Sequence, residues 1–230
     1  MKTQSIFIAG TDTGIGKTIV TGLMAEFFLR CGYKIITQKW IQTGIDSDID
    51  EHIRLMKKNR KNLIQHVSLM CPYHFQFPSS PHLAASIEKR TISKEKIKQS
   101  FWTLKKDFES ILVEATGGIL VPLSGSLFMI DIVKELSLPV VLVAGNKLGT
   151  INHTLLSIEA LKKRKIRILG IIFNNLEKKT DLRILEDNPV ILNKITGEKI
   201  LGVLPWTKDI NLLYRKFIPI GNKLDKHISQ

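Results

Sequence analysis

The chain has 230 residues, 43% of them hydrophobic, so it can bury a sizeable core and fits a single domain over residues 1–230. No apolar run reaches the roughly 18 residues that a membrane span needs, and the short polar start, residues 1–4, predicts no signal peptide. We therefore expect a cytoplasmic protein with no membrane partner, although the net charge of +13 raises the question of nucleic acid.

The first segment, residues 5–18, joins an apolar strand to a glycine-rich turn. Residues 6–9 are typical of a buried parallel strand, and an amphipathic pattern over residues 19–28 predicts a helix. Between them lie Gly10, Gly14, Gly16, Lys17 and Thr18. Backbone N–H groups and the lysine would face phosphates, and the threonine hydroxyl would hold Mg²⁺. The first glycine stands one position earlier than usual, so a turn without a ligand is the alternative, but the strand-to-helix context favours nucleotide binding.

A second strand over residues 34–38 ends at Lys39, with Thr43 shortly after it. Ligands of open parallel sheets lie beyond the carboxyl ends of strands, so both residues are placed for a pocket mouth. The acidic segment 46–51 follows. Its carboxylates could simply cap a helix, with Ser47 or Asp48 as the cap, or could supply an oxygen ligand to Mg²⁺.

Residues 70–82 are rich in proline and aromatic residues and are predicted to be a long loop beside a binding site. Helices are expected over residues 83–90 and 93–108. A third buried strand, residues 110–114, ends at Glu114 and is followed by Gly117 and Gly118. This carboxylate is either solvated or a second Mg²⁺ contact, and the glycines favour the second interpretation.

The rest of the chain continues the alternation. Strands are predicted at residues 139–144, 167–173 and 199–204, with a helix reaching about residue 165. From residue 207 we expect short helix or loop, with fraying from residue 223. The alternation predicts an α/β fold with a doubly wound, mostly parallel sheet and flanking helices.

These motifs, in this order, resemble the dethiobiotin synthetase family, whose fold is that of P-loop NTPases. The phosphate loop has that family's glycine spacing, and the segments after Lys39, around Ser80 and after Glu114 resemble its substrate and metal segments. Residues 147–153, Asn174 and Pro205 with Trp206 also fall where the family has them. The departures are Trp40 in place of proline and Ala115 with Thr116 in place of Gly-Ala.

The resemblance implies an ATP- and Mg²⁺-dependent ligase of biotin biosynthesis. It would carboxylate 7,8-diaminopelargonate with CO₂ or bicarbonate and close the ring through a carbamate and a carbamic-phosphoric anhydride. It also implies a homodimer, with the substrate carboxylate bound across the interface.

The resemblance assigns roles residue by residue. Lys17 and Lys39 would be catalytic, and Mg²⁺ would be held by Thr18, Glu114 and Asp48, with Asp50 as the alternative to Asp48. The implied ATP-binding residues are Thr13, Gly14, Ile15, Gly16, Lys17, Thr18, Ile19, Glu114, Gly117, Asn174 and Pro205. The implied substrate-binding residues are Lys39, Thr43, Ser80, Gly149, Thr150, Ile151 and Asn152.

Two rival classes can be weighed against the residues. In a GTP-dependent switch, Asn146-Lys147 would read guanine, but Gly149 stands where an acid is needed. In a partitioning-type P-loop ATPase, which the basic charge suits, a signature lysine would occupy position 12, which is Asp12 here. The lysine clusters are short, scattered and free of interleaved aromatic residues, so we expect a solvated basic surface and no nucleic-acid partner.

Overall fold

The computed structural model describes residues 4–228, and its centre is a six-stranded parallel sheet in the order β2-β5-β1-β6-β7-β8. Its strands are β1 (Ile6–Gly10), β2 (Ile35–Lys39), β5 (Ser110–Glu114), β6 (Val140–Gly145), β7 (Ile168–Asn174) and β8 (Ile200–Leu204). β1, β5 and β6 are buried at every position, because helices cover both faces of the sheet. The expected doubly wound parallel sheet with flanking helices is confirmed.

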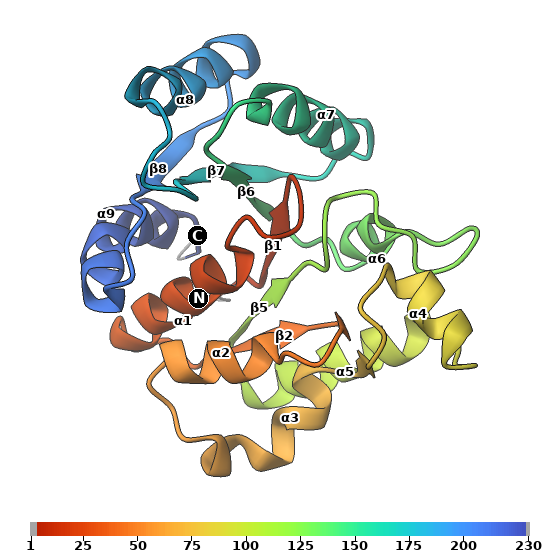
Figure 1. Cartoon of the computed structure of the whole chain (residues 1–230). Coiled ribbons are helices and arrows are strands. Elements are labelled where there is room, and N and C mark those ends of the chain that lie inside the picture. Colours follow the sequence, from red (N-terminus) through yellow and green to blue (C-terminus); the bar gives the residue numbers. More distant parts are fainter. Residues whose placement is uncertain (1–3, 229–230) are drawn as a thin grey trace.

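Helices lie on both sides of this sheet (Figure 1). They are α1 (Lys17–Arg30), α2 (Asp48–Leu55), α3 (Ile64–Met70), α4 (Pro81–Ile87), α5 (Lys94–Asp107), α6 (Met129–Glu135), α7 (Thr150–Lys163), α8 (Leu182–Thr196) and α9 (Ile210–Ile228), with a 3₁₀ turn, η1, at Arg60–Leu63. α1 and α9 cover one face, and α5, α6 and α7 cover the other (Figure 1). The chain thus leaves β1 and β5 toward opposite faces, which opens a crevice at the carboxyl ends of these strands.

α1 is packed closely against α2. A Cβ atom on Gly22 of α1 would lie only 2.4 Å from Leu55 Cδ1 at the end of α2. The glycine therefore sets the spacing of the two helices and seats α2 beside the start of α1.

The segment predicted as a loop over residues 70–82 contains a strand, so that prediction was incomplete. β4 (Tyr73–Phe75) pairs in parallel with β3 (Ile41–Thr43) in a separate two-stranded sheet. Tyr73 and Phe75 are buried and stack with their ring centroids 6.1 Å apart. Part of the aromatic character of this segment therefore serves packing.

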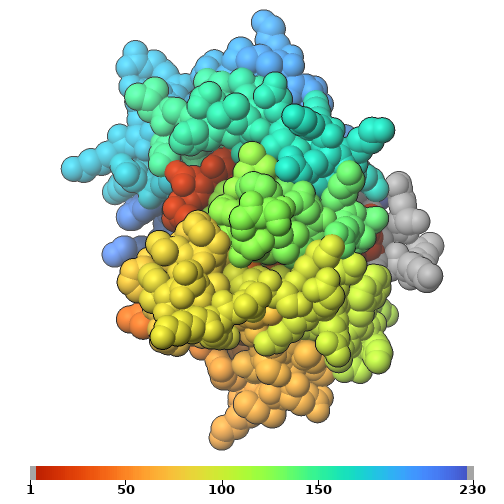
Figure 2. Space-filling model, turned by 90° about the vertical axis from the view of Figure 1, so that its right-hand side faces the viewer, coloured from red at the N-terminus to blue at the C-terminus, as the bar shows by residue number. Residues whose placement is uncertain are grey.

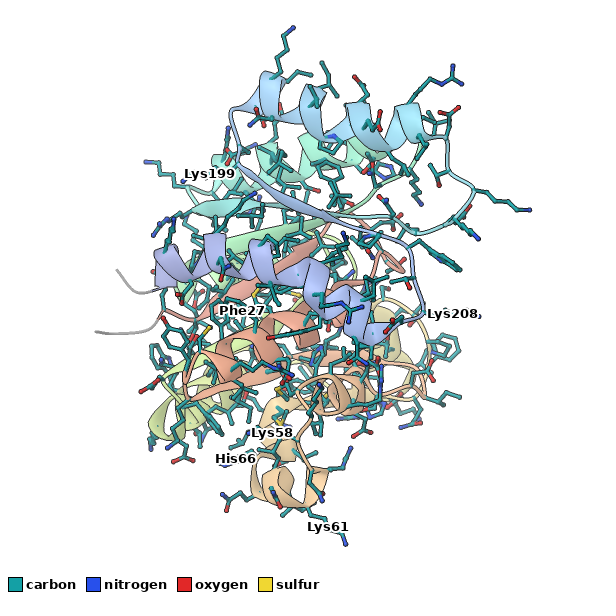
Figure 3. All side chains as sticks on the ribbon, turned by 90° about the vertical axis from the view of Figure 1, so that its left-hand side faces the viewer. Phe27, Lys58, Lys61, His66, Lys199 and Lys208 are labelled. Atoms are coloured by element: carbon teal, nitrogen blue, oxygen red, sulfur yellow. The ribbon has the colours of Figure 1, made fainter. Side chains whose placement is uncertain are left out.

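The prediction for the end of the chain was wrong. Instead of short helix and fraying from residue 223, α9 runs from Ile210 to Ile228; the last two residues of that prediction, 229–230, lie outside the described residues. Its buried residues Leu213, Phe217, Ile220 and Leu224 recur at helical spacing. Phe217 meets Phe27 of α1 with ring centroids 6.4 Å apart, and Figure 3 shows Phe27 beneath α9. Pro219 inside the helix concealed the pattern.

The basic residues are spread over the surface. Figure 3 shows Lys58 and Lys61 on the projecting lobe of η1 and α3, and Lys199 and Lys208 on distant parts of the molecule. Within residues 4–228, none of the helices is both long and apolar enough to cross a membrane.

Candidate active site

A hollow of about 280 Å³ lies at the carboxyl edge of the sheet, where the loops after β1, β2 and β5 meet the start of α2. Its lining residues are Thr13, Gly14, Gly16, Lys17, Thr18, Lys39, Gln42, Thr43, Asp48, Glu114, Thr116 and Gly117. All of these except Gln42 and Thr116 were predicted from the sequence to be site residues. The fold thus brings residues from three distant segments into one polar site.

The loop between β1 and α1 is shaped by its glycines. Gly14 and Gly16 have φ angles of 67° and 84°, in the left-handed region that favours glycine. Lys17 lies back over the loop, and its Nζ donates a hydrogen bond of 2.6 Å to the Asp12 carbonyl. A Cβ atom on Gly10 would lie 2.7 Å from Lys17 Cδ. The early glycine therefore makes room for the lysine side chain.

Lys39 enters the hollow from the end of β2 and is held by two carboxylates. Its Nζ lies 2.6 Å from Glu114 Oε1 and 2.8 Å from Asp48 Oδ2, and it donates to the Ala115 carbonyl at 3.0 Å. Burial opposes the charge of this ammonium, but Glu114 and Asp48 outweigh burial and raise its pKa above the ordinary value. Lys39 is therefore a fixed cation.

Lys17 is in a less favourable position for a cation. Burial first, and then the nearby charge of Lys39, lower its pKa to about 8. Two ammonium groups in one hollow lower the cost of bringing in an anion, because an anion would relieve both their repulsion and their desolvation.

Three oxygen atoms converge beside Lys39. Thr18 Oγ1 lies 3.0 Å from Asp48 Oδ1 and 3.1 Å from Glu114 Oε1. Burial favours the protonated form of Glu114, but the charge of Lys39 and a hydrogen bond from His52 outweigh it and lower the Glu114 pKa to about 2. A hydroxyl and two carboxylates are the hard oxygen donors that Mg²⁺ prefers. Among residues 4–228 no group of three or more His, Cys, Asp and Glu side chains is suited to a metal.

The structure separates the two aspartates that the sequence left as alternatives. Ser47 caps α2 by accepting a hydrogen bond of 3.2 Å from the Asp50 N–H. Asp48 then faces the hollow, whereas Asp50 is exposed and pairs with Arg60. The geometry favours Asp48.

Other residues named from the sequence lie outside the hollow. Ile15 is buried under the loop, and its carbonyl accepts a hydrogen bond of 2.9 Å from Asn174 Nδ2. Ile19 is half-buried in the first turn of α1, Ser80 precedes α4, and Pro205 follows β8. The last group, Gly149, Thr150, Ile151 and Asn152, forms the start of α7. None of these residues lines the hollow.

The start of α7 has polar groups available. Within residues 4–228 the helix has no side-chain cap, and the buried hydroxyl of Thr150 has no hydrogen-bond partner. A second hollow, of about 350 Å³, lies between α7, the loop after β1 and residues 118–121. Figure 2 looks onto this side, where red atoms of the N-terminal loop show between the green segment after β5 and the teal of α7. Leu120 and Leu156 line this hollow and are exposed, and so is Leu148 just before α7.

Sequence reasoning missed His52, whose Nε2 lies 2.6 Å from Glu114 Oε2 in the core. The available signal was its position four residues after Asp48, which places both on one face of α2. Its partner is 62 residues away in the chain, so the contact could not be read from local pattern.

Two further residues have structural explanations. Trp40 is fully buried, donates to Gln38 Oε1 at 2.9 Å and packs against Phe7, so it points into the core and not into the hollow. Asn146 is also fully buried, and its side chain bonds Asn175, the Leu185 carbonyl and Asn188. It is therefore engaged within the fold, which disfavours a guanine-reading role.

Several curated proteins similar to this chain carry the same description. A family model described as an AAA domain matches residues 4–212. The ATP-dependent dethiobiotin synthetase BioD of Thermodesulfovibrio yellowstonii is 36% identical, over 89% of this chain and 90% of that protein. The BioD proteins of Methanocaldococcus jannaschii and Chlorobaculum tepidum are 34% and 46% identical, over 93% and 76% of this chain and 99% and 74% of their own lengths.

Solved structures show the same fold at low identity. The MinD cell division protein of Aquifex aeolicus matches with a TM-score of 0.58 and 15% identity, covering 97% of both chains. The pNOB8 ParA structure bound to nonspecific DNA matches with a TM-score of 0.59 and 12% identity, covering 99% of both. At these identities the likeness concerns the fold alone.

Proposed function

The chain belongs to the ATP-dependent dethiobiotin synthetase family, and we propose that it carboxylates 7,8-diaminopelargonate and closes the ring of dethiobiotin at the expense of ATP. The observation that carries this proposal is Lys39, a buried ammonium at the end of β2 in the same hollow as the phosphate-loop lysine. An ATPase without an anionic second substrate has no evident need for it.

The phosphate loop and α1 would hold the triphosphate. N–H groups at the start of α1 and the Lys17 ammonium face the hollow and favour negative charge. Asn174, which already contacts the loop through the Ile15 carbonyl, and Pro205 lie at the ends of neighbouring strands and would receive the adenine. Thr13 and Gly117 would close over the phosphates.

The residues present fit a magnesium ion. Thr18, Asp48 and Glu114 would hold it. One oxygen of each carboxylate already lies within 3.1 Å of the Thr18 hydroxyl. A bound Mg²⁺ neutralises phosphate charge during phosphoryl transfer. A bound ion would offset the charge of the two carboxylates that now pair with Lys39, and the ammonium would then be available to an anionic substrate.

Lys39 would act on the carbamate. One amine of the substrate forms an N–C bond with CO₂ and loses a proton, which gives a carbamate anion. A carbamate oxygen then attacks the γ-phosphorus and ADP leaves with the electrons of the broken O–P bond. The second amine attacks the carbamate carbon and loses a proton, inorganic phosphate leaves with the electrons of the broken C–O bond, and the ring closes. The ammonium offsets the repulsion between carbamate and γ-phosphate, which is greatest as they meet.

The far end of the substrate would be bound by a second subunit. Thr43 and Ser80 would contact the diamine end, and the N–H groups of residues 149–152 would receive the carboxylate. A homodimer would bring the start of α7 of one copy to the hollow of the other. Leu120 and Leu156, which are exposed and line the second hollow beside α7, support this arrangement, since a second copy would cover them.

A partitioning-type P-loop ATPase is the alternative, and the MinD and ParA structures share its fold. The position of its signature lysine holds Asp12, whose carbonyl accepts the hydrogen bond of Lys17. That alternative also leaves Lys39 unexplained.

Product analysis tests the proposal. The purified protein is incubated with 7,8-diaminopelargonate, bicarbonate, Mg²⁺ and ATP, and dethiobiotin is measured by mass spectrometry. We expect dethiobiotin and ADP in equal amounts, and ATP hydrolysis that rises only when both the diamine and bicarbonate are present. ATP hydrolysis that ignores both, or that responds to DNA, would favour the alternative.

A further inference from the structure

His52 contacts Glu114 from the side of the core. Its ring is fully buried, Glu114 is 2% exposed, and Nε2 lies 2.6 Å from Oε2. An ionised carboxylate only accepts hydrogen bonds, so the histidine nitrogen that faces it carries a proton and donates it. The contact is short and screened from water, which makes it strong.

The two oxygens of Glu114 have different partners. Oε1 faces the hollow, where it meets Thr18 and Lys39, and Oε2 faces His52. The terminal torsion of a glutamate is broad and easily rotated. A donor on Oε2 therefore fixes the direction in which Oε1 points.

His52 and Asp48 belong to the same face of α2. They are four residues apart, so the helix that brings Asp48 to Thr18 also brings His52 to Glu114. The helix itself is fixed by its Ser47 cap and by its contact with Gly22. In residues 4–228 the other ring nitrogen of His52, Nδ1, has no hydrogen-bond partner, so Glu114 is the polar contact that orients the ring.

We propose that His52 is a positioning residue for the metal site: its Nε2–H orients Glu114 so that Oε1 faces Thr18 and Asp48, and it thereby sets the affinity for Mg²⁺. This inference rests on the proposed function only in taking Thr18, Asp48 and Glu114 as the metal site. Outer partners of this kind change metal affinity by roughly 10- to 100-fold.

Three substitutions separate positioning from packing. In His52→Gln the amide nitrogen replaces Nε2. In His52→Asn the amide nitrogen takes the place of Nδ1, and the side chain is too short to reach Glu114. His52→Leu fills the space without a donor. Affinity for Mn²⁺, used as the probe, is measured by EPR on the full chain with ADP present, together with ADP affinity without metal and the melting temperature.

We expect His52→Leu and His52→Asn to weaken Mn²⁺ binding about tenfold. His52→Gln should restore most of this loss, and metal-free ADP affinity should stay at the wild-type level in all three. In a Glu114→Gln background, His52→Leu should cause no further loss, because the two residues act through one contact. If the leucine variant does not fold, the glutamine and asparagine variants provide the same contrast.

Wild-type Mn²⁺ affinity in His52→Leu with a lowered melting temperature would overturn the inference and leave a structural histidine. Equal losses in the glutamine and asparagine variants would also overturn it. If the wild type makes no dethiobiotin but the Mn²⁺ series behaves as expected, the proposed function fails and the role of His52 stands. If dethiobiotin forms and Mn²⁺ binding ignores residue 52, only the inference fails.

Discussion

The two halves of the carboxyl edge of the sheet differ in how completely their side chains are paired or covered within the fold. Around β1, β2 and β5 the charges are matched internally, with Lys39 between Asp48 and Glu114 and His52 behind them. Around β6, β7 and β8, by contrast, apolar side chains are left uncovered. Leu148, just before α7, is 83% exposed, and Leu156 within α7 is 56% exposed.

The contrast indicates which parts of the site are already organised. The first half holds its side chains in place before any ligand arrives, which is the preorganisation that phosphoryl transfer requires. The second half leaves apolar surface uncovered, which fits the second subunit that we propose.

Lys17→Ala should have the largest effect, because it removes the cation of the phosphate loop from the half of the edge around β1, β2 and β5. We expect dethiobiotin formation to fall by about 10³-fold or more while the melting temperature changes little. Turnover close to that of the wild type would show that the loop does not hold the phosphates.

Lys39→Gln should have the second-largest effect, a loss of about 10²-fold in kcat. The ammonium of Lys39 acts mainly as the carbamate approaches phosphorus. ATP should still bind, as calorimetry can show. Lys39→Arg should rescue poorly, since a planar guanidinium does not fit the place of a compact ammonium. Full activity in either variant would remove the main support for the carbamate step.

Asp48→Asn and Asp50→Asn form a matched pair on one helix. Asp48 faces Thr18, whereas Asp50 pairs with Arg60 on the surface. We expect Asp48→Asn to raise the Mg²⁺ concentration for half-maximal activity by at least about tenfold, and Asp50→Asn to leave it unchanged. The reverse result would assign the metal contact to Asp50.

Leu156→Lys tests the half of the edge around β6, β7 and β8, and Ile195→Lys is its control. Both side chains are 56% exposed, but Leu156 lies on α7 beside the second hollow and Ile195 lies on α8. We expect Leu156→Lys to halve the mass in light scattering and to raise KM for the diamine by about tenfold, a loss of roughly 1.4 kcal/mol of substrate binding. A wild-type protein that is already monomeric would refute the shared site.

The smallest expected effect is a shift in pH dependence. The Lys17 pKa of about 8 means that its ammonium loses its proton as pH rises through that value, so metal-free ATP affinity should fall there. The charge of Lys39 contributes to this low pKa, and Lys39→Gln should therefore move the midpoint upward. ATP titrations across about pH 7 to 9.5 would show it, and a flat profile would mean that Lys17 does not meet the phosphates.

The fold and most of the residues that line the hollow could be predicted from the sequence, because parallel strands place their final residues at one edge of the sheet. Lys39 and Glu114 each end a strand, so their meeting followed from strand order. His52 could not be found in this way, since its partner depends on how α2 is seated. α9 was missed because Pro219 interrupts a helical pattern that only contact with α1 makes stable.

Gly22 shows how a constraint can act at a distance. It lies outside the hollow, yet a side chain there would press on Leu55 and displace α2, which carries both Asp48 and His52. Selection that preserves Asp48 and His52 should therefore also preserve a glycine at position 22. Mutational tolerance in this protein should follow the packing of α1 and α2 as closely as it follows distance from the reacting atoms.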